Sequence, residues 1–241
     1  MKLAPLVGLL LLLASCIAIA APKKPEPDQE VVVLIHGYGR SKMAMWSLET
    51  KLEQAGYFVA NVGYSSLTQD LQGIKNETFA QIQSCCVQLP NQVHFVGHSM
   101  GGLLIRSYLA EHRPKYLGRV VLLGSPNKGT EVADHFKDHP LVGLAGPVAS
   151  KLGTAKDSFP NSLPLPDYPV GVIAGAVNSG KQSGTSKILP GEDDGMVTVE
   201  SAKLEGMTDF ILMPVAHYFM RSNKEVAKQI IHFLKVGKFQ K

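Results

Sequence analysis

The stretch VHFVGHSMGGLLIRSYL, residues 93–109, passes from a short apolar run through a cluster of glycines into an apolar pattern with helical spacing. Ser99 lies at this transition, in the pattern G-x-S-x-G that Gly97 and Gly101 bound. Because glycine has no Cβ atom, the two flanking glycines let a strand turn sharply into a helix, and this turn lifts the serine hydroxyl above the strand end. The order strand, motif, helix predicts that Ser99 is a nucleophile.

The same alternation of apolar runs and helical patterns continues along the chain. Apolar runs typical of strands buried on both faces begin at Val31, Tyr57, Val93, Arg119, Val170 and Asp209. Helical patterns cover residues 43–55, 69–87, 100–113 and 223–235. Strands that alternate with helices favour a parallel sheet wound by right-handed crossovers. We therefore predict an α/β fold with three layers, α/β/α, and a mostly parallel sheet of about six strands.

Length and composition indicate one globular domain, which we assign to residues 31–241. The chain has 241 residues, of which 45% are hydrophobic and 18% are charged. These fractions are typical of a globular protein with a substantial core. The formal net charge of +4 is spread along the chain without a block of basic residues. This distribution argues against a nucleic-acid partner.

The N-terminal segment is expected to direct export. Residues 1–20 contain one early lysine followed by an apolar stretch that is too short for a comfortable membrane span, which fits a signal peptide. Residues 21–30 form a Pro-rich tether. Cleavage before Ala21 would give a soluble periplasmic or secreted protein. The sequence LASC equally resembles a lipobox, in which case a lipidated Cys16 would attach the protein to a membrane.

Two further segments carry expectations. Residues 131–169 lack a clear strand and are rich in Gly and Pro, so we expect either a cap over a pocket or a surface excursion that packs on the sheet edge. We call them the cap-like segment. Cys85 and Cys86 are adjacent late in a helical pattern, and adjacent cysteines rarely bridge each other. We expect two buried free thiols.

A nucleophilic serine needs a base and an orienting acid. In the hydrolase arrangement the chain order is serine, acid, histidine, which leaves His217 and His232 as the base. His232 falls on the outer side of the last helical pattern, whereas His217 follows the last apolar run, and we select His217. The acid is expected in the turn GEDDG, where Asp194 is preferred and Asp193 is the alternative. The alternative interpretation, a solvated acidic turn, fits one of these two carboxylates better than both.

The tetrahedral intermediate of acyl transfer needs two hydrogen-bond donors for its oxyanion. The first is the amide of Met100, at the start of the helix that follows Ser99. The second is the amide of Tyr38, since it follows Gly37 in the loop HGYG after the first strand.

Five motifs, VVLIHGYG, GHSMGG, LGSPNKGT, DDGMV and VAHYFM, together resemble the α/β-hydrolase superfamily, in particular small bacterial lipases and esterases. The resemblance runs from Val31 to the last helix. The chain departs from the full fold of this superfamily in lacking its first two strands, so we expect a minimal form. The resemblance implies a triad of Ser99, Asp194 and His217. It also implies backbone oxyanion donors at Tyr38 and Met100, no cofactor and no metal.

The sequence thus predicts a serine carboxyl-ester hydrolase that acts on a small-molecule or lipid ester through an acyl-enzyme on Ser99. An acyltransferase would use the same three residues. A non-catalytic binding protein on a hydrolase scaffold is the remaining alternative, although the usual signs, a missing triad member or a crowded turn, are not seen.

Overall fold

The computed structural model describes residues 24–86, 92–139, 145–177 and 184–241. The expected signal peptide, with Cys16 and Ala21, lies outside the described residues, as do the first three residues of the tether and residues 140–144 of the cap-like segment. Among the described residues, no helix combines the length and apolar character needed to span a bilayer.

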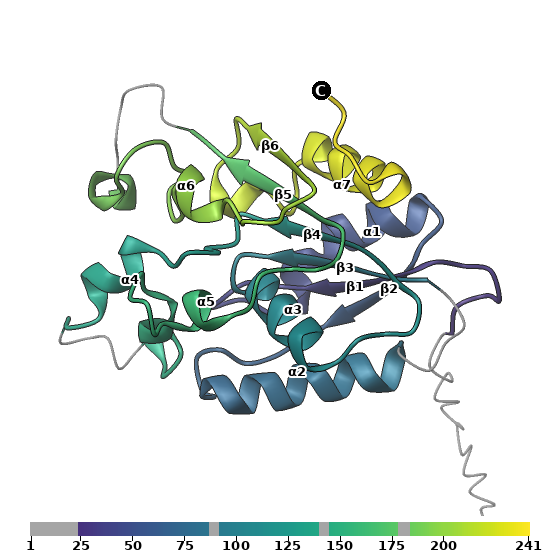
Figure 1. The fold of residues 1–241 in the computed structure, drawn as a ribbon, viewed down its shortest axis with the longest axis horizontal. Helices are drawn as coiled ribbons and strands as arrows, with labels where there is room; N and C mark the ends of the chain where they lie inside the picture. Colours follow the sequence, from purple (N-terminus) through teal and green to yellow (C-terminus); the bar gives the residue numbers. More distant parts are fainter. Residues whose placement is uncertain (1–23, 87–91, 140–144, 178–183) are drawn as a thin grey trace, which may run out of the picture.

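Six parallel strands form the sheet at the centre of the domain (Figure 1). They are β1 (Val31–Ile35), β2 (Phe58–Val62), β3 (Val93–His98), β4 (Leu117–Leu123), β5 (Val170–Gly175) and β6 (Asp209–Met213). Their order across the sheet is β2-β1-β3-β4-β5-β6, and every pair is parallel. The predicted α/β fold with about six strands is confirmed. All carboxyl ends lie at one edge, so the loops that follow the strands meet there.

Helices cover both faces of this sheet. On one face, Val31 and Val33 of β1 pack in a cluster with apolar residues of α2 (Leu71–Cys85) and α3 (Met100–Glu111). On the other face, Val32 packs in a cluster with apolar residues of α1 (Trp46–Gln54) and α7 (Lys224–Val236). This alternation explains why β1 is apolar on every residue. The shorter elements are η1 (Lys42–Met45), α4 (Glu131–Phe136), η3 (Ala149–Leu152), α5 (Phe159–Ser162), η4 (Gly184–Ile188), α6 (Val199–Ala202) and η5 (His217–Phe219).

The cap-like segment connects β4 to β5 at the carboxyl edge of the sheet, on the left in Figure 1. Its described residues form α4, η3 and α5 and contain no strand. Val148 and Phe159 are buried in the same cluster as α3. The Tyr38 hydroxyl donates to the carbonyl of Ala145, so the segment also contacts the loop after β1. The segment is therefore fixed to the edge at which Ser99 lies.

The expectation of free thiols at Cys85 and Cys86 is wrong, because the two sulfur atoms form a disulfide. Cys85 is the last residue of α2 and Cys86 already has a non-helical backbone, with φ −138° and ψ −28°. The pair therefore spans the helix end, where the backbone is not held in helical geometry. The Cys86 amide still donates to the Ile82 carbonyl at 3.2 Å.

The first turn of α3 lies so close to β1 that Gly101 has no room for a side chain. A Cβ atom there would lie 2.4 Å from the Ile35 carbonyl oxygen and 2.5 Å from that of His36. Both contacts are with backbone, so Gly101→Ala must displace the helix from the sheet, and we expect the free energy of unfolding to fall by about 3 kcal/mol. Chemical denaturation measures this change.

Gly63→Ala is the matched control, since a Cβ atom at Gly63 would meet nothing nearer than 3.7 Å. Its free energy of unfolding should stay within about 0.5 kcal/mol of the wild type. Equal stability of the two variants would contradict the close packing of α3 on β1.

Candidate active site

Ser99 lies in a strained turn between β3 and α3. Its backbone has φ 55° and ψ −126°, and it is the only non-glycine residue with positive φ in the described ranges. Such a conformation costs about 1–3 kcal/mol and persists only where its surroundings impose it. Here the Ser99 amide donates to the Leu123 carbonyl at 2.8 Å, and the Gly102 amide donates to the Ser99 carbonyl at 3.0 Å. The turn therefore fixes the Ser99 side chain at the carboxyl edge of the sheet.

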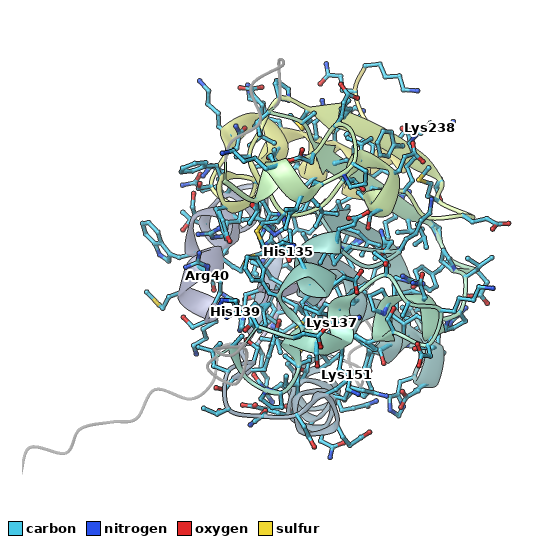
Figure 2. All side chains as sticks on the ribbon, turned by 90° about the vertical axis from the view of Figure 1, so that its left-hand side faces the viewer. Arg40, His135, Lys137, His139, Lys151 and Lys238 are labelled. Carbon is cyan, nitrogen blue, oxygen red and sulfur yellow. A yellow bond between two sulfur atoms is a disulfide. The ribbon has the colours of Figure 1, made fainter. Side chains whose placement is uncertain are left out.

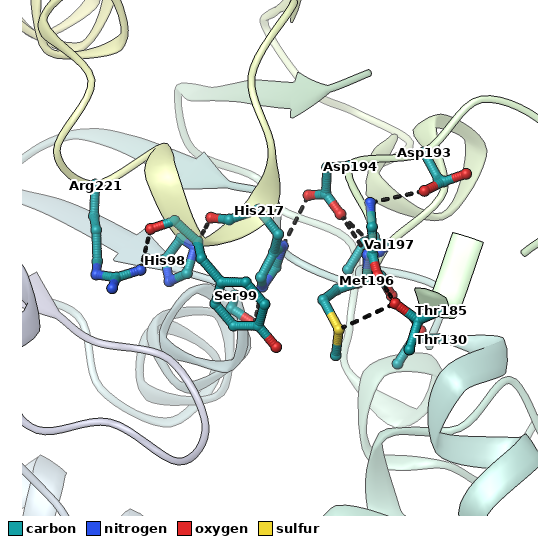
Figure 3. A network of polar contacts seen from close by, with 12 residues as sticks. His98, Ser99, Thr130, Thr185, Asp193, Asp194, Met196, Val197, His217 and Arg221 are labelled. Atoms are coloured by element: carbon teal, nitrogen blue, oxygen red, sulfur yellow. Dashed lines mark hydrogen bonds and ion pairs between the residues drawn. The ribbon is translucent and has the colours of Figure 1, made fainter. Parts of the chain in front are cut away.

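A chain of hydrogen bonds joins Ser99 to His217 and Asp194 (Figure 3). The His217 Nδ1–H donates to Asp194 Oδ2 at 2.8 Å, since a carboxylate can only accept. In the tautomer that carries its proton on Nδ1, Nε2 of His217 accepts from the Ser99 hydroxyl at 3.0 Å. His217 and Asp194 are both buried, so water does not compete for these bonds. The arrangement can remove the serine proton and stabilise the imidazolium that forms.

The two adjacent carboxylates of the GEDDG turn have different partners. Asp194 uses Oδ2 for His217, while its Oδ1 accepts from the amides of Met196 and Val197 at 2.9 and 2.8 Å. Asp193 instead accepts from the Gly195 amide and the Ser186 hydroxyl. Asp193 is fully buried, so the interpretation of a solvated carboxylate in this turn is wrong for either residue. Asp194 is the one bonded to His217.

Two glycines that the sequence interpretation did not assign to the site make room for the Asp194–His217 pair. A Cβ atom at Gly124, directly after β4, would lie 2.9 Å from Asp194 Oδ2 and 3.1 Å from His217 Nδ1. A Cβ atom at Gly175, at the end of β5, would lie 2.9 Å from Asp194 Cβ. The motif LGSPNKGT therefore contributes its first glycine, Gly124, to the packing of the pair.

The loop after β1 approaches Ser99 from the other side. A Cβ atom at Gly37 would lie 2.9 Å from Ser99 Cβ, so only glycine fits between the loop and the serine. His36 fixes the loop, because its Nδ1–H donates to the Gly37 carbonyl at 2.8 Å and its Nε2 accepts from the Tyr64 amide at 3.2 Å. The Tyr38 and Met100 amides thus belong to the two backbone segments, one on each side, that flank Ser99.

His98 holds the turn that carries His217, a role that the sequence interpretation missed. Its Nε2–H donates to the His217 backbone carbonyl at 2.9 Å, and the two rings lie 4.7 Å apart. Its Nδ1 is buried without a hydrogen-bond partner among the described residues. Burial, reinforced by the nearby His217, holds the pKa of His98 well below its usual range, so the ring is neutral. The only available signal was its position beside Ser99.

Among the residues that the structure describes, no group of three or more His, Cys, Asp or Glu side chains could hold a metal ion.

Stability should fall on mild acidification because three histidines are buried. Burial lowers the pKa of His36, His94 and His98 below the ordinary value of about 6.5. The unfolded chain therefore binds protons below about pH 6.5 that the folded chain does not. The free energy of unfolding should keep its full value above about pH 6.5. At lower pH it should decrease, by up to about 1.4 kcal/mol per pH unit for each histidine.

Chemical denaturation at several pH values between 7.5 and 5.5 measures how the free energy of unfolding changes with pH. The variant His98→Gln tests the contribution of His98 to this slope. The side-chain amide of Gln can still donate to the His217 carbonyl, but it does not titrate. The slope should therefore decrease by the contribution of one histidine. An unchanged slope in this variant would contradict a neutral, buried His98.

Three comparisons relate the chain to known proteins. A family model described as palmitoyl protein thioesterase matches residues 31–159, more than half of the chain. The match contains Ser99 and the loop of Tyr38 and ends ahead of Asp194 and His217. The chain is also 28% identical, over 116 residues, to triacylglycerol lipases of Pseudarthrobacter phenanthrenivorans and Burkholderia plantarii. That alignment covers 44% of this chain and only 36% and 32% of the two lipases, so it spans about a third of their length.

Solved structures show the same fold. The mature form of a Bacillus licheniformis lipase superposes with a TM-score of 0.71 at 22% identity, covering 89% of this chain and 94% of that one. A phospholipase of Legionella pneumophila superposes with a TM-score of 0.67 at 13% identity, covering 87% of this chain and 59% of that one. The resemblance to bacterial lipases is thereby confirmed, and the chain belongs to the palmitoyl protein thioesterase family, with an α/β-hydrolase fold like that of bacterial triacylglycerol lipases.

Proposed function

We propose that the protein is a serine hydrolase that cleaves carboxyl esters of an acyl chain through an acyl-enzyme on Ser99. The observation that carries this proposal is the unbroken hydrogen-bonded chain from Asp194 through His217 to Ser99, which ends on a serine held at φ 55°. A merely structural serine would not require a strained backbone, because an unstrained turn costs less.

Acylation begins when His217 Nε2 takes the hydroxyl proton of Ser99 while Oγ attacks the carbonyl carbon of the ester. The former carbonyl oxygen becomes an oxyanion, which the amides of Tyr38 and Met100 stabilise. The carbonyl then reforms as the bond to the alcohol oxygen breaks. The imidazolium of His217 gives its proton to the departing alcohol, and Asp194 stabilises that imidazolium until the proton leaves.

Deacylation repeats these steps with water in place of serine. His217 removes a proton from water, the resulting hydroxide attacks the acyl carbon, and the bond to Ser99 Oγ breaks. The proton returns to Ser99, and the free acid leaves. One ester and one water thus give one alcohol and one acid, and the enzyme is restored.

The substrate class is proposed from two observations. The cap-like segment anchors apolar residues such as Val148 and Phe159 in the core cluster that contains α3. It also contacts Tyr38 in the loop beside Ser99, and a largely apolar segment in this place suits an acyl chain better than a polar acyl group. The relatives with 28% identity are triacylglycerol lipases. A thioester of the same acyl chain is a second candidate, favoured by the family match; the same steps would release a thiol in place of an alcohol.

Ser99→Ala should lower kcat for p-nitrophenyl esters by about 10⁴- to 10⁶-fold, because the nucleophile is lost while the fold is kept. A fluorophosphonate should label the wild type at Ser99, as located by peptide mass spectrometry. Ser125→Ala is the matched control, since Ser125 is also buried and lies two residues after the end of β4. This variant should still be labelled at Ser99. Full activity in Ser99→Ala would disprove the mechanism.

Asn substitutions at the two adjacent carboxylates should separate their roles. Asp194→Asn removes the acceptor that fixes the His217 tautomer, so kcat should fall by about 10⁴-fold. Asp193→Asn weakens the turn through its bonds to Gly195 and Ser186, so it should cost about 1–3 kcal/mol of stability and leave kcat per folded molecule within about tenfold. Rates are compared after active-site titration, and a reversed order would assign the orienting role to Asp193.

A further inference from the structure

Two segments beside the site expose apolar side chains to an unusual degree. Residues 40–46 follow the loop of Tyr38, and residues 218–221 follow His217; we call them together the rim patch. Met43, Phe219 and Trp46 are 72%, 66% and 64% exposed, the highest values for large hydrophobic residues in the described ranges. Exposed apolar groups gathered in this way mark interaction surfaces.

The exposed residues of the rim patch stand on rigid supports. Met45 and Met220 are fully buried and belong to one core cluster, which also contains residues of α1 and α7. Met43 and Trp46 therefore flank one buried anchor, and Phe219 precedes another. Their exposure is a property of the packed fold, because the backbone beside each of them is anchored in the core.

The rim patch is also cationic. Arg40, Lys42 and Arg221 lie in the two segments, which contain no acidic residue. The Arg40 guanidinium lies 5.0 Å from the centre of the Tyr218 ring, and Arg221 donates to the Tyr218 carbonyl, so the two arginines converge on one residue. Burial and the neighbouring Arg40 together lower the pKa of Arg221.

The nearest acidic side chain along the chain, that of Glu49, accepts a hydrogen bond from Asn61 at 2.7 Å. Two like charges held together within segments that lack a carboxylate favour an anionic partner.

This combination fits a lipid surface better than a soluble partner. Tryptophan, methionine and phenylalanine partition into the boundary between headgroups and acyl chains, while Arg and Lys attract anionic headgroups. We propose that the rim patch docks the protein onto anionic lipid bilayers, with Met43, Trp46 and Phe219 inserted at the interface. Docking itself does not depend on the hydrolase proposed above. The advantage of docking does depend on the proposed hydrolase activity. Tyr38 and His217 adjoin the rim patch, so docking would bring the active site to the surface that holds acyl chains.

Trp46 supplies the probe, because it is the only tryptophan in the chain. The experiment uses full-length Ser99→Ala protein, which cannot turn over lipid, with vesicles of phosphatidylcholine alone or mixed equally with phosphatidylglycerol. Mixed vesicles should shift the Trp46 emission to the blue and sediment the protein, and 0.5 M NaCl should weaken both effects. No shift with the mixed vesicles, or an equal shift with neutral ones, overturns the proposal.

Variants assign the binding to the rim patch. Arg40→Gln with Lys42→Gln should lower the partition coefficient by about 30-fold, from about fivefold per charge. Lys238→Gln is the matched control for charge, because Lys238 lies far from Arg40 when the carboxyl edge is viewed directly (Figure 2), and it should change the coefficient by less than about twofold. Met43→Ser should reduce the emission shift, whereas Leu165→Ser, which removes another exposed apolar residue, should not.

If the control variants lose as much binding as the rim patch variants, the binding arises elsewhere and the proposal fails. The two proposals fail separately. Vesicle binding by Ser99→Ala, together with no ester hydrolysis by the wild type, would leave docking intact and overturn the hydrolase. Hydrolysis of soluble esters by the wild type, together with no vesicle binding, would support the hydrolase and overturn docking.

Discussion

The position of one imidazole ring governs the chemistry available to this protein. Asp194 holds His217 twice, through its carboxylate to Nδ1 and through its backbone carbonyl, which accepts from the His217 amide at 2.9 Å. His98 holds the His217 carbonyl. Because these three bonds restrain both the ring and its backbone, Nε2 can only be directed at Ser99. The strained serine turn and the glycines around the pair serve the same alignment.

Much of the fold was predictable because each element carries its own local signal. The apolar runs identify the strands, and helical spacing identifies α1, α2, α3 and α7 to within a few residues. Parallel order follows from the alternation of the two, since a crossover must return the chain to the same sheet edge. Ser99 and His217 could be selected for a related reason: Ser99 follows directly after β3 and His217 lies in the turn after β6, and the carboxyl ends of all six strands meet at one edge.

What could not be predicted depends on contacts between distant segments. Gly124 and Gly175 are separated from His217 by many residues, and nothing in their neighbourhood indicates that a carboxylate and an imidazole will occupy the space beside them. His98 presented a similar difficulty, because its partner is a backbone carbonyl, which every residue possesses. Asp194 was the preferred acid, but the sequence did not indicate that Asp193 would also be buried, with the Ser186 hydroxyl and the Gly195 amide as its partners.

The disulfide between Cys85 and Cys86 has a consequence for where such a domain can exist. A disulfide stabilises a protein chiefly by closing a loop in the unfolded chain, and the effect grows with the number of residues enclosed. Neighbouring cysteines enclose none. Reduction would therefore release almost no chain freedom, and the folded state relies on its two apolar layers in place of a covalent link between distant segments. Loop-closure entropy therefore gives this fold no reason to be more stable in oxidising than in reducing surroundings.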